Sequence, residues 1–132
     1  MARLTIEECT PQNLSPLSLA FVGDGVYDLF VRETLVCAAN RPLKDLNRLK
    51  VEQVRCQAQA KLMQTIEPLL TEEEAAVYRR GRNAHTGHTP KNATNADYHA
   101  ATGFEALLGY LYLCGRIERI RELVSFHSQS EI

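Results

Sequence analysis

The sequence lacks any apolar run long enough to cross a bilayer, which takes roughly 20 consecutive apolar residues. The apolar core of a signal peptide is also missing from its N-terminal stretch, MARLTIEECTPQ. We therefore expect neither membrane insertion nor secretion.

Cysteine pairs at metal-binding spacing are absent too. Three of the four cysteines fall inside apolar helical patterns, where a thiol serves as a small hydrophobic side chain. The four are Cys9, Cys37, Cys56 and Cys114. We interpret them as reduced core residues of a cytoplasmic protein, with a zinc site or a disulfide as the less favoured alternative.

A large charge excess is the third missing feature, since 15 basic and 16 acidic residues leave a net charge of −1. This balance argues against a protein that coats nucleic acid through its overall field, so any RNA contact must be local. No acidic residue occurs between Ala75 and Ala96, a stretch that we call the basic segment. Its basic and histidine residues are Arg79, Arg80, Arg82, His85, His88 and Lys91.

Alternating strand patterns, repeats and linkers are not found either, so we expect one all-α domain, a helical bundle spanning residues 1–132. The predicted helices follow from apolar spacing, from a capping box at Thr71 and Glu74 and from a stop at Gly115. They cover residues 16–38, 43–66 with a possible break after the first turn, 72–81, 97–114 and 116–124. The fourth is apolar nearly all round, which predicts the central buried helix.

Asp24 lies between two glycines in the apolar stretch LAFVGDGVYDLF. Each glycine costs about 1 kcal/mol relative to alanine inside a helix. Glycines beside a carboxylate allow a backbone, a phosphate or a hydrated metal ion to approach closely. Close helix packing, with Asp24 at the solvent edge, explains them equally well.

Glu105 lies within another apolar stretch, ATGFEALLGYLYL, where a charge needs a partner. An ion pair with arginine or a helix cap is the simplest explanation. However, Gly109 follows one turn later and again permits close approach. Two carboxylates on apolar helices, each with a glycine neighbour, together suggest a shared magnesium site.

The two motifs occur in the order found in a known family. GDGVYDLF resembles the signature helix of ribonuclease III domains, and TGFEALLGYLYL resembles their second acidic helix. With RGRN and PKN before the second motif and no appended double-stranded-RNA-binding domain, the pattern resembles Mini-ribonuclease III, a group within that family. The resemblance covers nearly the whole chain.

This resemblance implies the ribonuclease III endonuclease fold and a magnesium-dependent endoribonuclease that cleaves double-stranded RNA. Asp24 and Glu105 become the catalytic residues and the Mg²⁺ ligands that position and activate water. The resemblance also implies a homodimer with the Asp24 helix at its interface, each subunit cutting one strand to leave a short 3′ overhang. The implied biological role is maturation of the ends of large-subunit ribosomal RNA precursors.

Two supporting carboxylates of the family are missing, because Ala20 and Thr102 occupy their positions. This leaves more of the magnesium coordination to water and RNA phosphate. Asp28 and Asp97 are weaker candidates for an assisting role. A non-catalytic RNA-binding dimer on the same scaffold and a purely structural helical module remain alternatives.

Double-stranded RNA is recognised mainly through its shape, phosphates and 2′-hydroxyls, which suits a polar, basic loop. The resemblance favours RNA binding over a merely solvated loop for part of the basic segment. The residues concerned are Arg79, Arg80, Arg82, Asn83, His85, Thr86, Lys91 and Asn92.

The double substitution Arg82→Ala/Lys91→Ala tests this loop. If each side chain neutralises one phosphate, each replacement should reduce the slope of log affinity against log salt concentration by about the contribution of one phosphate contact. Filter binding of an RNA duplex across a salt series measures the slope. An unchanged affinity and slope would show that the loop is only solvated.

Overall fold

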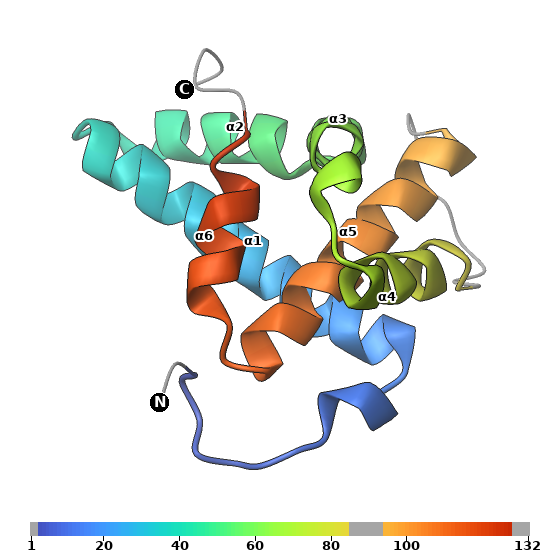
Figure 1. Cartoon of the computed structure of the whole chain (residues 1–132). Coiled ribbons are helices and arrows are strands. Elements are labelled where there is room, and N and C mark those ends of the chain that lie inside the picture. Colours follow the sequence, from blue (N-terminus) through green and yellow to red (C-terminus); the bar gives the residue numbers. More distant parts are fainter. Residues whose placement is uncertain (1–2, 85–93, 128–132) are drawn as a thin grey trace.

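The all-α prediction is confirmed by a computed structural model, which describes residues 3–84 and 94–127 (Figure 1). Those residues contain no strand. The α-helices are α1 (Pro16–Ala38), α2 (Leu43–Val54), α3 (Cys56–Ile66), α4 (Glu72–Arg82), α5 (Asn95–Leu113) and α6 (Ile117–Val124). Two short 3-10 helices accompany them, η1 (Pro11–Asn13) and η2 (Glu67–Leu69).

Local capping signals set the starts of three helices. The side chain of Ser15 accepts a hydrogen bond from the backbone N–H of Ser18 at the start of α1. Thr71 and Glu74 form the predicted capping box of α4. Thr94 caps α5, which therefore begins two residues earlier than the sequence pattern suggested.

The helix predicted over residues 43–66 is two helices, and the break lies at Arg55 rather than after the first turn. Arg55 is extended, with φ −68° and ψ 159°. The apolar spacing through Val54, Ala58 and Leu62 continues across the break, so the pattern alone does not mark it. The turn brings α3 against α5 while α2 stays with α1 (Figure 1).

Helix α5 is the centre of the fold, and α1, α3 and α4 pack around it (Figure 1). Its side chains Phe104, Leu107, Leu108 and Leu111 are fully buried. The prediction of a central buried helix is thus correct.

Two glycines allow α1 and α5 to cross with their backbones nearly in contact. A β-carbon added at Gly23 would overlap the carbonyl oxygen of Glu105, and one added at Gly109 would overlap the carbonyl oxygen of Leu19. Gly25 differs, because nothing lies within 4 Å of the position of its missing β-carbon. The glycine pair at the crossing therefore serves close helix packing.

An ion pair connects α4 to α6. The guanidinium of Arg119 donates to both carboxylate oxygens of the buried Glu74 at 2.8 Å. These bonds to Arg119 outweigh the effect of burial and lower the pKa of Glu74. The same carboxylate also accepts the Thr71 backbone N–H, so one side chain fixes both a helix start and a helix pair.

The cysteine interpretation is half wrong. All four thiols are free, but Cys9 and Cys37 are exposed and Cys56 and Cys114 are only half-buried, so none is a core residue. Apolar periodicity predicted burial for three of them, whereas Cys37 lies on an exposed face of α1, Cys56 begins α3 and Cys114 follows the end of α5. In the part of the chain that the structure describes, no helix is long and apolar enough to span a membrane.

Alanine at each of two glycines of α1 should change stability in opposite directions. We expect Gly23→Ala to destabilise the protein by about 3 kcal/mol, because the β-carbon must push α5 away. Gly25→Ala should stabilise it by up to about 1 kcal/mol, because alanine favours the helix and meets no neighbour. Urea unfolding at one protomer concentration measures both. Equal effects would contradict the backbone contact.

Candidate active site

The close crossing of α1 and α5 brings Asp24 and Glu105 together. Gly23 packs against the backbone of Glu105, and Asp24 is the next residue along α1. The two carboxyl groups are near enough for the negative charge of Asp24 to raise the pKa of Glu105. Asp24 is exposed and Glu105 half-buried, so the pair lies where the core meets the surface.

Burial and repulsion raise the pKa of Glu105 to about 8. Desolvation contributes most, followed by the negative charge of Asp24; a hydrogen bond from Gln59 opposes them. No described arginine or lysine is among the groups that set this value. The expected ion pair with arginine is therefore not what holds the side chain of Glu105.

Gln59 of α3 is a site residue that the sequence analysis missed. Its side chain is 2% exposed, and its Nε2 donates to Oε2 of Glu105 at 3.3 Å. A detectable signal was present, because Gln59 begins the buried face of α3. The other members of that face are Leu62, Met63 and Ile66, at the i+3, i+4 and i+7 positions.

The two positions where family carboxylates are missing supply no replacement. Ala20 is buried and apolar. Thr102 is also buried, and its hydroxyl donates to the carbonyl oxygen of Tyr98 within α5 at 3.0 Å. Both positions are filled by groups that serve the fold.

Asp28 is engaged elsewhere. It forms ion pairs with Arg32 at 2.6 Å and with Lys50 of α2 at 3.3 Å. Partial burial alone would raise the pKa of Asp28, but the contacts with Arg32 and Lys50 lower it. Its carboxylate links α1 to α2.

Asp97 and Cys56 lie at the margin of the site. Burial, with further contributions from the charges of Glu105 and Asp97, raises the pKa of the Cys56 thiol. No group of three or more histidine, cysteine, aspartate or glutamate side chains suited to a metal occurs in residues 3–84 and 94–127. A pair of carboxylates without thiol or imidazole ligands suits magnesium, which prefers oxygen and keeps several waters.

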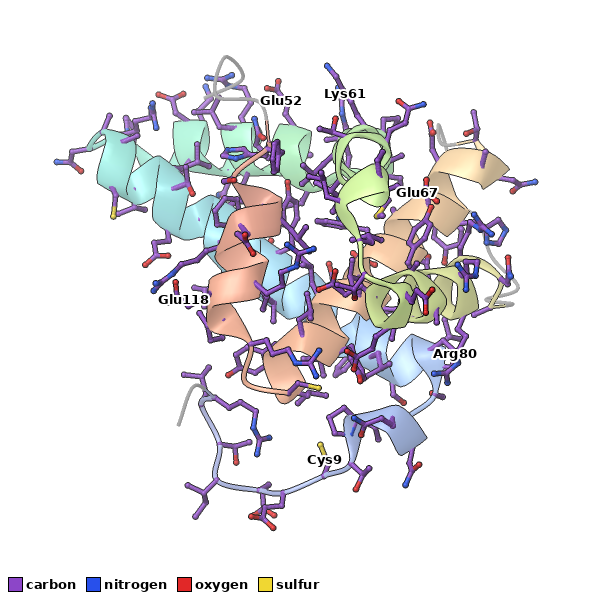
Figure 2. All side chains as sticks on the ribbon, viewed as in Figure 1. Cys9, Glu52, Lys61, Glu67, Arg80 and Glu118 are labelled. Atoms are coloured by element: carbon purple, nitrogen blue, oxygen red, sulfur yellow. The ribbon has the colours of Figure 1, made fainter. Side chains whose placement is uncertain are left out.

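The structure describes residues 75–84 and 94–96 of the basic segment. Arg79, Arg80 and Asn83 are exposed, and Arg80 donates to the carbonyl oxygen of Leu14 at 3.4 Å. Figure 2 shows Arg80 on the outer surface at α4. The guanidinium of Arg82 lies over the ring of Tyr78, 5.4 Å from its centroid. The other predicted RNA-binding residues lie outside the described residues: His85, Thr86, Lys91 and Asn92.

The chain is similar in sequence and in fold to known proteins. Residues 17–116 match the Ribonuclease III domain family. The chain is 46% identical over 117 residues to Mini-ribonuclease 3 of Thermoanaerobacter sp., covering 89% of this chain and 82% of the relative. It is 47% identical over 114 residues to Mini-ribonuclease 3 of Symbiobacterium thermophilum, covering 86% and 88%. An X-ray crystal structure of a Fusobacterium nucleatum protein matches with a TM-score of 0.83 at 27% identity, covering 92% and 97%.

Magnesium affinity should depend on pH through Glu105. Below about pH 8 the metal-free protein holds a proton on this carboxyl group, and a bound cation must displace it. We expect the apparent affinity to rise by up to about tenfold per pH unit below pH 8 and to level off above it. Calorimetric titration between pH 6.5 and 9 measures this, and a flat profile would contradict it.

The same carboxyl group should affect stability. Because the folded-state pKa is raised above its ordinary value, its favourable contribution is complete below pH 4.5 and is lost as the pH rises through 8. The matched variant Glu105→Gln should remove this loss, so that the metal-free variant melts higher than the parent at pH 9.

Proposed function

The chain belongs to the ribonuclease III domain family and is an endoribonuclease of that type, and we propose that it cleaves double-stranded RNA with magnesium held by Asp24 and Glu105. The observation that carries the proposal is the pair of neighbouring carboxyl groups at the α1–α5 crossing, where Gly23 packs against the backbone of Glu105. Without a cation the two groups repel each other once both are ionised, which contributes to the raised pKa of Glu105. A divalent ion would turn the same geometry into a favourable one.

The chemistry assigned to the two carboxylates follows from their position. Magnesium, when bound, supplies charge neutralisation and an activated water for phosphodiester hydrolysis. Asp24 is at the exposed edge, where a phosphate of the RNA backbone has access. The side chain of Glu105 accepts a hydrogen bond from Gln59, and its backbone packs against Gly23 of α1, so Glu105 is the more rigid member of the pair.

The basic segment provides the RNA contact that we propose. Arg79, Arg80 and Asn83 extend from the C-terminal half of α4 into solvent, where phosphates can reach them. Arg82 stacks on Tyr78, which restricts its guanidinium before any RNA arrives. His85, Thr86, Lys91 and Asn92 complete the proposed contact on the basis of the sequence pattern.

We further propose that the active form is a homodimer. An apolar groove of about 700 Å³ lies along α1 and α6. Val22, Val26 and Leu29 line its α1 side, and Ile117, Ile120 and Val124 its α6 side. A two-fold partner would cover this groove and place one carboxylate pair at each strand of an antiparallel duplex, and this arrangement would give paired cuts with a short 3′ overhang.

The substrate that we propose is the large-subunit ribosomal RNA precursor, trimmed at its ends in the cytoplasm. This substrate follows from the resemblance to Mini-ribonuclease III, and four free thiols agree with a reducing compartment. A second candidate, an RNA-binding dimer without catalysis, would bind the same duplex but leave it intact.

Cleavage of a long RNA duplex in magnesium tests the proposed reaction. We expect Asp24→Asn and Glu105→Gln each to reduce the rate by at least about 1,000-fold, since each removes an anionic metal ligand at constant volume. Duplex binding in calcium and helical content by circular dichroism should stay close to parental values. An Asp24→Asn or Glu105→Gln variant that cuts at the parental rate would refute the assignment.

Sedimentation of two matched variants tests the dimer. Leu29 and Val36 are both on α1 and both 59% exposed, but only Leu29 lines the groove. Leu29→Glu should raise the dimer dissociation constant by at least about tenfold, because it buries a charge at the interface, whereas Val36→Glu should not. If both variants sediment as the parent does, the dimer uses another surface.

A further inference from the structure

Gln59 has a buried amide with an unusual set of partners. Its Nε2 donates two hydrogen bonds, one to the carbonyl oxygen of Val54 at 2.7 Å and one to Oε2 of Glu105 at 3.3 Å. Both amide protons are therefore used. Its Oε1 is buried and has no hydrogen-bond partner.

The backbone break at Arg55 fixes the orientation of this amide. Val54 is the last residue of α2, so its carbonyl oxygen is released from the helical hydrogen-bond ladder. A carbonyl oxygen can only accept, and the amide must turn its nitrogen toward it. The same turn directs the second N–H at Glu105.

This arrangement is costly if Gln59 serves packing alone. A buried acceptor without a partner costs roughly 1–3 kcal/mol, and an apolar side chain of similar length would avoid that cost. The other residues on this face of α3 are apolar: Leu62, Met63 and Ile66. A glutamine at this one position, in contact with a catalytic carboxylate, indicates a role in the site.

We propose that Gln59 is a positioning residue for the nuclease reaction, which holds Glu105 in the orientation that faces Asp24 and so prearranges the pair for a shared cation. The inference rests on the proposed function. Positions 20 and 102 carry alanine and threonine instead of the family's supporting carboxylates. The amide of Gln59, which is anchored to the backbone at Val54, would supply the orientation that those acidic ligands would otherwise give to Glu105.

Manganese binding without RNA is the primary test, with Mn²⁺ as a spectroscopic stand-in for magnesium. Gln59→Met removes both donors at similar length, and Gln64→Met is the matched control, because Gln64 is exposed on the same helix. At pH 9 we expect Gln59→Met to raise the manganese dissociation constant by about tenfold or more. Electron paramagnetic resonance of free Mn²⁺ measures this, and the control should bind like the parent.

Steady-state cleavage supplies a second readout that a structural role would not give. Gln59→Met should lower kcat by about tenfold while the KM for duplex RNA stays unchanged, because the basic segment, and not the carboxylate pair, binds the duplex. Lower thermal stability with parental manganese affinity and kcat would overturn the inference. If Gln59→Met does not fold, Gln59→Leu is measured in the same way.

Failure of this inference and failure of the proposed function give different results. If Asp24→Asn abolishes cleavage and manganese binding while Gln59→Met changes neither, only the role of Gln59 is refuted. If the parent protein does not cut RNA at all, the proposed function is refuted, and manganese affinity still decides whether Gln59 orients Glu105.

Discussion

The structure depends on one close contact, the crossing of α1 and α5 through Gly23 and Gly109. Side chains normally hold packed helices 8–10 Å apart, and glycines remove that spacing. The contact brings the two carboxylates near each other, since Asp24 follows one glycine and Glu105 provides the carbonyl oxygen that the same glycine meets. Of the two explanations considered for the glycines beside Asp24, the structure supports close helix packing at Gly23, and approach of a metal ion or phosphate to Asp24 stays a proposal.

The site places two carboxyl groups close together where burial and mutual repulsion both disfavour their ionised forms. Desolvation and a like charge raise the pKa of Glu105 to about 8, so this carboxyl group keeps its proton at neutral pH. A scaffold with strong interactions elsewhere can sustain such a site. The fully buried core of α5 and the Glu74–Arg119 pair between α4 and α6 are two of these interactions.

The sequence predicted those features that depend on local pattern. Helix α1, the capping box at Thr71 and the central position of α5 follow from spacing and from cap residues over short stretches. Asp24 and Glu105 stood out because charges and glycines are costly in apolar helices. The family resemblance added their shared role, and the match over residues 17–116 confirms the family.

The features that the sequence did not reveal depend on tertiary contacts. The break at Arg55 is absent from the apolar pattern, because α3 turns to reach α5 without changing its periodicity. The amide of Gln59 gains a role only once that turn has placed it between Val54 and Glu105. The burial of the cysteines was predicted wrongly for a related reason, since apolar spacing does not tell which side of a helix another helix will cover.

The central claim is that the glycine crossing creates a cation site from two carboxylates. Anomalous diffraction from crystals soaked in manganese tests it most directly. We expect a strong peak within coordinating distance of carboxylate oxygens of both Asp24 and Glu105. A manganese ion bound elsewhere, with both of these carboxylates free of metal, would contradict it.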